Sequence, residues 1–296
     1  MNPLTIRNLK KRYGKKMALD GLNMNVPKNK VYGYLGENGA GKTTTFSILG
    51  GFISATAGTF EWEGKLGMLP QDARFTGGRS IKSQLRLLAK LAGVPKKEID
   101  GEIKRVLTIV NMDEHLNLAV NQCSHGMYKR IGIAQALLGD PDVILFDEPT
   151  AGLDPKNAHD IRKLIEGLNH KKTIVISSHN LSEIEQICDH VGIIHQGKMA
   201  YEGPVEALVS QEGSLIFTLN QKPKLKPITS LPDVTEATWL EDKKQLHVEF
   251  EGQKTNSQTM NRKILEILLQ DQIGILSIHS GKNLEQEYLK QLVKSD

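Results

Sequence analysis

Residues 36–43 place glycines around one lysine and one threonine in the spacing G-x-x-x-x-G-K-T, a pattern that suits phosphate binding. Glycines let successive backbone N–H groups converge on phosphate oxygens, and a helix that begins there adds the positive end of its dipole. Lys42 can then reach the β- and γ-phosphates, and the Thr43 hydroxyl can take a place on Mg²⁺. The alternative is a tight glycine turn that only joins a strand to a helix. The residues expected to contact nucleotide in this loop are Gly36, Asn38, Gly39, Ala40, Gly41, Lys42, Thr43 and Thr44.

Asp147 and Glu148 are adjacent carboxylates at the end of the apolar run Val143–Phe146. A carboxylate at the end of a buried strand can hold Mg²⁺, while its neighbour can orient or deprotonate an attacking water. The same pair could be ordinary polar residues at a strand end, but the phosphate-binding loop upstream favours a catalytic pair. Together the two motifs predict a nucleotide enzyme and leave kinases, GTPases and ATPases open.

Strands alternating with helices are needed to position these motifs, and the apolar pattern predicts them. Continuous apolar runs at Val143–Phe146 and Thr173–Ile176 indicate buried parallel strands. Period-2 patterns predict further strands at Leu4–Ile6, Leu22–Val26 and Val31–Leu35, and a strand pair at Thr59–Glu63 and Leu66–Leu69. Residues from about 81 to 138 are predicted to be helical throughout, with Pro95 starting the second helix. This order is typical of a doubly wound α/β sheet with an inserted helical block.

The pattern of predicted strands and helices changes near Gly213, which predicts a second domain. Before it, Val191–Tyr201 is predicted to form a hairpin that turns at Gln196 and Gly197. After it we expect a small α+β unit and therefore two domains, 1–212 and 213–296. Its predicted elements are strands at Leu215–Leu219, Val234–Leu240, Leu246–Phe250 and Ile273–Ile278, a helix at about Met260–Gln270 and a final helix from Asn283.

Composition excludes several other classes of protein. No apolar run approaches the roughly 20 residues of a membrane helix. The two cysteines cannot form a disulfide framework, so we expect a cytoplasmic protein. Aromatic residues make up only 5%, and the net charge of +4 is spread along the chain, so no nucleic-acid partner is expected.

These motifs, in this order, resemble the ABC ATPase family over roughly residues 1–212. The resemblance implies that Tyr13 stacks on adenine and that Gln71 reaches Mg²⁺ and the attacking water. It also assigns Asp147 to the metal, with Thr43 and Gln71, and Glu148 to the role of catalytic base. His179 matches the histidine that contacts the γ-phosphate.

Further matches concern a second protomer. Residues 123–127, Cys-Ser-His-Gly-Met, stand where the family signature is usually Leu-Ser-Gly-Gly-Gln. The resemblance implies that Ser124 and Gly126 face the γ-phosphate bound by the opposite protomer, and that Asp154 lies in a loop at the dimer interface. Asp154 is also a candidate N-cap for the following helix. Cys123 and His125 depart from the usual signature, and this departure leaves the rate of ATP hydrolysis open.

The resemblance implies a P-loop NTPase core with a RecA-like sheet, an antiparallel β subdomain and a helical subdomain at about 72–140. It implies ATP and Mg²⁺ as cofactors, a homodimer or heterodimer of ATPase subunits, and a separate ABC permease. The chain would then lie on the inner face of the cell membrane through that permease. The small C-terminal unit is most similar to those of drug- and polysaccharide-type exporter ATPases. Alternatives are an importer ATPase, a non-transport ABC ATPase that acts on ribosomes or DNA, and an ATP-dependent regulatory module.

Overall fold

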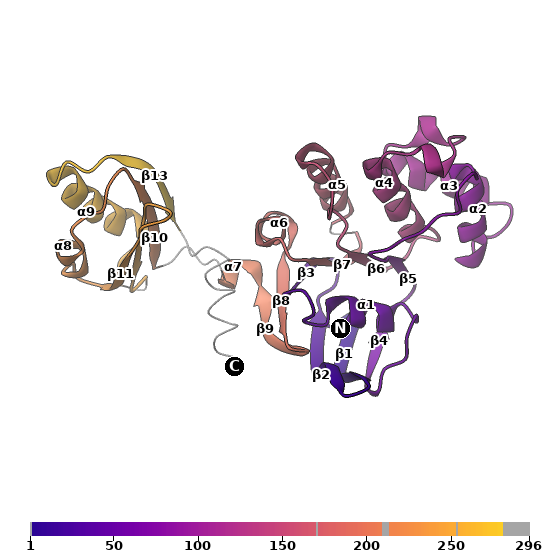
Figure 1. Cartoon of the computed structure of the whole chain (residues 1–296), viewed down its shortest axis with the longest axis horizontal. Helices are drawn as coiled ribbons and strands as arrows, with labels where there is room; N and C mark the ends of the chain where they lie inside the picture. The colour runs from indigo at the N-terminus through magenta and orange to yellow at the C-terminus, as the bar shows by residue number, and fades with distance from the viewer. Residues whose placement is uncertain (1, 170, 209–212, 253, 281–296) are drawn as a thin grey trace. The chain divides into compact units, whose positions relative to one another are not determined.

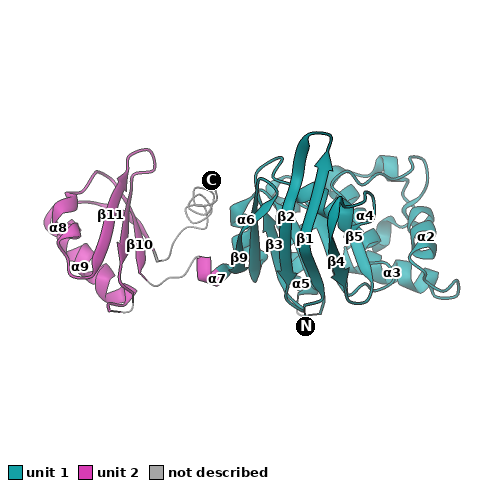
Figure 2. Ribbon diagram, turned by 90° about the horizontal axis from the view of Figure 1, so that it is seen from below, with its two compact units in different colours: residues 1–205, 291–296 teal, residues 206–290 magenta. Residues whose placement is uncertain are grey.

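The computed structural model describes residues 2–169, 171–208, 213–252 and 254–280, and the chain divides into two compact units. The first contains residues up to Val205, and the second begins at Glu206 (Figure 2). The predicted final helix from Asn283 lies outside the described residues. Among the described residues, no helix is both long and apolar enough to cross a membrane.

A six-stranded sheet organises the first unit, in the order β5-β6-β7-β3-β8-β9. Its strands run parallel, except that β9 returns antiparallel to β8 through the predicted turn at Gln196 and Gly197. The predicted buried strands are confirmed as the central β6 and β7, in which every residue is buried. The six strands are β3 (Val31–Leu35), β5 (Leu66–Leu69), β6 (Val143–Asp147), β7 (Thr173–Ser178), β8 (His190–His195) and β9 (Lys198–Pro204).

A separate antiparallel sheet, β2-β1-β4, and helix α1 cover one face of this central sheet (Figure 1). The sheet is formed by β1 (Leu4–Tyr13), β2 (Lys16–Val26) and β4 (Ala57–Trp62), and α1 spans Lys42–Leu49. Buried apolar residues from both sheets and from α1 form one core; they include Leu4, Met24, Phe46 and Leu145. Phosphate-binding residues at the start of α1 are therefore held between two layers.

The predicted pairing of Thr59–Glu63 with Leu66–Leu69 is wrong. Strand β4 pairs with β1, and β5 pairs in parallel with β6, so the two strands belong to different sheets. The connection turns at Gly64 and is then tied to the start of β6, because Lys65 N–H donates to Asp142 Oδ2 at 2.9 Å. The carbonyl of Lys65 in turn accepts from the N–H of Asp142 at 2.9 Å.

Helices α4 (His125–Ala136), α5 (Pro155–Leu168) and α6 (Leu181–Ile187) lie on the other face of the central sheet (Figure 1). Helices α2 (Ile81–Leu91) and α3 (Ile99–Ile109) pack against each other and against α4. Short 3-10 turns at Asp113–His115 and Val120–Gln122 precede α4. Helix α4 is therefore the element that links this helical block to the sheet.

The expectation of helix throughout residues 81–138 is wrong between these helices. The chain leaves α2 through Gly93 and α3 through Asn111, both with positive φ, which stops a right-handed helix. Pro95 does not begin α3, since the N-cap is Glu98. The Pro95 carbonyl accepts from Glu98 N–H at 2.8 Å, so the proline initiates the turn that leads into the helix.

The second unit is a four-stranded antiparallel sheet in the order β11-β12-β10-β13. Apolar side chains of its strands pack with α9 in a core of their own that includes Phe217, Val248 and Ile264. Its predicted strands and long helix are confirmed, with the last strand shifted by two residues. The elements are β10 (Ser214–Leu219), α8 (Leu225–Thr229), β11 (Val234–Leu240), β12 (Gln245–Phe250), α9 (Ser257–Gln270) and β13 (Ile275–Ser280), preceded by the short helix α7 (Val205–Leu208).

Candidate active site

The phosphate-binding loop runs from the end of β3 to the start of α1 and is shaped by its glycines. Gly39 and Gly41 have φ of 88° and 119°, a region that other residues rarely adopt. A Cβ on Gly36 would lie 2.6 Å from the carbonyl oxygen of Ile194, and one on Gly41 would lie 2.7 Å from Leu19 Cδ2. Side chains at these positions would therefore push the loop away from β8 and β2.

Lys42 closes the loop on itself. Its ammonium donates to the carbonyls of Gly36, at 2.6 Å, and Glu37, at 3.2 Å. The side chain is only 6% exposed, and this burial lowers the pKa of Lys42, while the nearby carboxylates of Glu148 and Asp147 act in the opposite sense. A phosphate group would give this buried ammonium a charged acceptor in place of two neutral carbonyls.

Three segments supply the oxygen atoms that are expected to bind a metal ion. Thr43 Oγ1, at the start of α1, donates to Gln71 Oε1 at 3.3 Å, just after β5. Asp147 at the end of β6 supplies a carboxylate, and the nearby Thr43 hydroxyl acts to lower the pKa of that group. A hydroxyl, an amide and one carboxylate are hard oxygen ligands of the kind that Mg²⁺ accepts together with waters and phosphate oxygens.

Ser177 links the Asp147 carboxylate to the backbone of Glu148, and the sequence analysis did not identify it. It lies opposite Asp147 in the β6–β7 pairing. Its hydroxyl donates to Asp147 Oδ1 and accepts from the backbone N–H of Glu148 at 2.9 Å. Asp147 is 1% exposed, and burial raises its pKa, with the bond from Ser177 opposing that rise. A bound cation would relieve the cost of holding this carboxylate ionised.

Glu148 and His179 face each other across the ends of β6 and β7. His179 Nδ1 lies 3.2 Å from Glu148 Oε1, and the Glu148 side chain is 12% exposed against 61% for His179. Glu148 has a φ of 48°, an uncommon conformation for a residue with a side chain. Lys129 of α4 supports it by donating to the Glu148 carbonyl at 3.1 Å. Lys129 is buried, which lowers its pKa, and the sequence analysis did not identify it either.

One cleft of about 240 Å³ brings most of the predicted residues together. Tyr13 stands at its edge, 49% exposed, with Lys11 Nζ 5.0 Å from the ring centroid. Two residues that sequence reasoning missed, Lys16 and Ala18, complete the lining. The predicted residues that line the cleft are Tyr13, Asn38, Gly39, Gly41, Lys42, Thr43, Thr44, Gln71 and Glu148.

Ser124, Gly126 and Asp154 do not line that cleft and instead form the N-termini of two helices. Ser124 caps α4, where its hydroxyl accepts from Met127 N–H at 3.2 Å. Asp154 caps α5, and its hydrogen bonds, that from the Asn157 side chain foremost, hold its pKa below the usual range. A Cβ on Gly126 would lie 2.8 Å from Asn157 Oδ1. Asn157 therefore connects the two helix starts.

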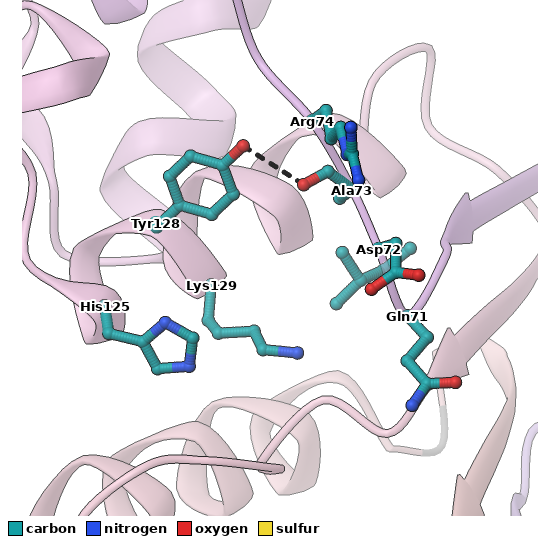
Figure 3. Close-up of a pocket in the computed structure, with 8 residues that line it drawn as sticks. Gln71, Asp72, Ala73, Arg74, His125, Tyr128 and Lys129 are labelled. Carbon is teal, nitrogen blue, oxygen red and sulfur yellow. Dashed lines mark hydrogen bonds between the residues drawn. The ribbon is translucent and has the colours of Figure 1, made fainter.

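A second pocket, of about 340 Å³, lies between α4 and the segment that follows Gln71 (Figure 3). Tyr128 of α4 fixes that segment, since its hydroxyl donates to the Ala73 carbonyl at 3.1 Å and accepts from Phe75 N–H at 2.8 Å. His125 and Lys129 line the α4 side (Figure 3). Gln71 lines both this pocket and the phosphate cleft, so a movement of the segment would displace Gln71, one of the residues expected to bind the metal.

Comparison with known proteins gives consistent similarities. The protein family described as ABC transporter matches residues 19–151. Bacitracin transport ATP-binding protein BcrA of Bacillus licheniformis is 41% identical over 68% of this chain and 69% of its own length. Nod factor export ATP-binding protein I of Burkholderia lata is 29% identical over 97% of this chain and 96% of its own.

A solved structure, cbiO1 of Clostridium perfringens, part of the ABC transporter complex cbiONQ, superposes with a TM-score of 0.63 at 26% identity. The superposition covers 70% of this chain and 90% of that one. This likeness confirms the α/β fold that was predicted from the sequence.

Proposed function

The chain belongs to the ABC transporter family of ATP-binding proteins, which are ATPases coupled to transport, and we propose that it powers a separate membrane-spanning permease in an exporter. The observation that carries the proposal is a single cleft lined by Lys42, Thr43, Gln71 and Glu148. A cationic side chain that can bind phosphate, oxygen donors for a metal and a carboxylate base therefore lie in the same cleft.

Each of these groups has a distinct role in hydrolysis. Lys42 and the backbone N–H groups of residues 36–43 bind the β- and γ-phosphates, and Tyr13 stacks on adenine. Thr43, Gln71 and Asp147 would hold Mg²⁺, which offsets charge on the phosphates when bound. Glu148 takes a proton from a water whose oxygen attacks the γ-phosphorus, and the bond to the ADP oxygen breaks. His179, which faces Glu148, donates to the γ-phosphate as charge develops.

A second protomer completes each site in this proposal. Ser124 and Gly126 lie outside the phosphate cleft of their own chain, at the start of α4 near the start of α5, where Ser124 is exposed and Gly126 is buried beside Asn157. That position suits them to contact the γ-phosphate bound by a partner, with Asp154 in the contact loop. Two protomers would close head-to-tail on two ATP molecules, and hydrolysis would reopen them.

The permease would contact the segment after Gln71 and the helical block, because this segment packs against α4 and directly follows Gln71, which lines the phosphate cleft. The chain would thereby be held at the inner face of the cell membrane.

We further propose the functional division 1–212 for the ATPase and 213–296 for an accessory domain, since every residue assigned to the site lies before 213. Bacitracin transport and Nod factor export are properties of the relatives.

Two measurements test this proposal together. Mg²⁺-dependent ATPase activity of the purified chain should depend on Glu148, and co-expression with its permease should carry the chain into the membrane fraction. Membrane recovery that is equal with and without a permease would contradict the assigned partner. ATP binding without hydrolysis in the wild-type complex would favour a regulatory module.

A further inference from the structure

A buried carboxylate outside the phosphate cleft has no role in the mechanism described above. Glu183 lies in the first turn of α6 and is 2% exposed. Its two oxygens accept from two hydroxyls: Oε1 from Thr150 Oγ1 at 2.7 Å and Oε2 from Ser178 Oγ at 2.8 Å. Within the described part of the chain, the Glu183 carboxylate contacts these two hydroxyls and forms no ion pair with a lysine or arginine.

The two hydroxyls belong to the two loops that carry the catalytic side chains. Thr150 follows Glu148 by two residues, and the next residue, Ala151, donates its N–H to the Glu148 carbonyl at 3.3 Å. Ser178 ends β7 and directly precedes His179. One carboxylate thus joins the loop after β6 to the end of β7, and Glu148 and His179, the residues that directly follow these two strands, lie 3.2 Å apart.

Helix capping alone does not account for this arrangement. Asn180 is the N-cap of α6, and its side chain accepts from Glu183 N–H at 3.3 Å. In a capping box, the acidic residue at this position returns to the backbone N–H of the N-cap residue. Here that N–H, of Asn180, donates to Ser178 Oγ at 3.0 Å, which leaves the Glu183 carboxylate to reach across to Thr150.

We propose that Glu183 is a positioning residue that sets the separation of Glu148 and His179 by holding both loops, an inference that rests on the proposed ATPase function. Hydrogen bonds to an ionised acceptor are stronger and more directional than those between neutral groups. A displacement of about 1 Å at a reacting group can cost about 10² in rate. Loss of the carboxylate should therefore lower kcat by roughly 10- to 100-fold and leave ATP affinity nearly unchanged.

The test compares Glu183→Ala and Glu183→Gln with single-arm variants, Thr150→Val and Ser178→Ala. Glu185→Gln is the matched control, because it removes the same charge from the exposed side of the same helix. For each variant, kcat, KM, ATP affinity by direct titration and Tm are measured. We expect the largest fall in kcat for Glu183→Ala and smaller falls for Glu183→Gln and the single-arm variants. ATP affinity should stay within about twofold of the wild type, and Glu185→Gln should match the wild type.

A kcat for Glu183→Ala within twofold of the wild type would overturn the inference, as would a fall in ATP affinity equal to the fall in kcat. If Glu183→Ala does not fold, Thr150→Val and Ser178→Ala decide by the same criteria. Failure of the proposed function has a different pattern, since the wild type would then lack ATPase activity or Glu148→Gln would retain it. Normal activity of all Glu183, Thr150 and Ser178 variants, beside an inactive Glu148→Gln, would refute the positioning role alone.

Discussion

The imidazole Nδ1 of His179 lies 3.2 Å from Oε1 of Glu148, although 31 residues separate them in the chain. Pairing of β6 with β7 brings them together, because each residue follows the end of its strand. When Glu148 is ionised, this contact is a hydrogen bond only if the imidazole carries its proton on Nδ1. Such a bond fixes the ring, and Nε2 can donate to the γ-phosphate only when it carries a hydrogen as well.

His179→Ala should therefore remove both a γ-phosphate contact and the group that orients Glu148. We expect kcat to fall by roughly 10²-fold, the scale for a positioned polar group in catalysis, with ATP affinity largely retained. Single-turnover hydrolysis and equilibrium titration with ATP separate these two effects. Wild-type single-turnover rates would remove His179 from the site.

Lys42→Ala should act on binding as well as on rate. The ammonium is buried and would contact phosphate in the ground state, and hydrogen bonds to charged groups contribute about 1.5–3 kcal/mol. ATP affinity should therefore fall by roughly 10- to 100-fold. Lys15→Ala, which removes an exposed lysine outside the cleft, is the control. Equal affinities of Lys42→Ala and wild type in a direct titration would count against the phosphate assignment.

Asp147→Asn should separate stability from metal binding. Burial raises the pKa of Asp147, so the folded chain keeps this proton to higher pH than the unfolded chain does. The stability from that proton is fully present below the unfolded pKa of about 3.9 and is lost as pH rises through the folded-state pKa. At pH 7 the nucleotide-free Asp147→Asn variant should therefore have the higher Tm, by roughly 2–4 °C for each kcal/mol gained in the free energy of unfolding.

The same variant should lose most of the rise in Tm that Mg-ATP gives the wild type, since a carboxylate is missing from the metal position. Thermal melts from pH 5 to 8, with and without Mg-ATP, measure both effects. An equal Mg-ATP shift in the two proteins would exclude Asp147 as a metal ligand.

Gly126→Ala should impair the contact with a second protomer. The added methyl would lie 2.8 Å from Asn157 Oδ1, so the Asn157 side chain, which donates to Asp154 Oδ2 at 2.6 Å, must shift. We expect ATP-driven dimerisation to weaken while ATP affinity of the monomer stays within about twofold, because Gly126 does not line the phosphate cleft.

Gly167→Ala is the matched control for that experiment, because a Cβ there meets nothing within 4 Å. In α5 this change should stabilise the fold by about 0.5–1 kcal/mol and leave dimerisation unchanged. Sedimentation in a hydrolysis-deficient background measures both variants. If Gly126→Ala dimerises as tightly as Gly167→Ala, residues 124–126 do not face a partner.

The functional groups that could be predicted from the sequence are those whose residue types and spacing within one segment are diagnostic. The loop that ends in Lys42 and the pair Asp147 and Glu148 are of this kind. Ser177, Lys129 and Glu183 were missed because their roles arise from tertiary contacts: Ser177 lies opposite Asp147 only once β6 pairs with β7, and Lys129 reaches the Glu148 carbonyl from α4.

The wrong strand pairing has the same cause. The two-residue connection between the predicted strands favours a hairpin locally, whereas the contact between Lys65 and Asp142 is set by a segment 77 residues away. Similarly, helical periodicity in residues 81–138 did not reveal where Gly93 and Asn111 would stop the helices. Strand and helix types were predictable because burial sets their periodicity.

Glu148→Gln tests the central claim most directly, because it replaces the base with an amide of nearly the same shape and should leave Lys42, Thr43 and Asp147 in place. The measurement is Mg²⁺-dependent hydrolysis together with the oligomeric state in ATP. We predict ATP binding equal to that of the wild type, hydrolysis slower by at least roughly 10²-fold, and a dimer that persists while ATP remains. Wild-type turnover by Glu148→Gln, or loss of its ATP binding, would contradict the assignment of Glu148 as the base.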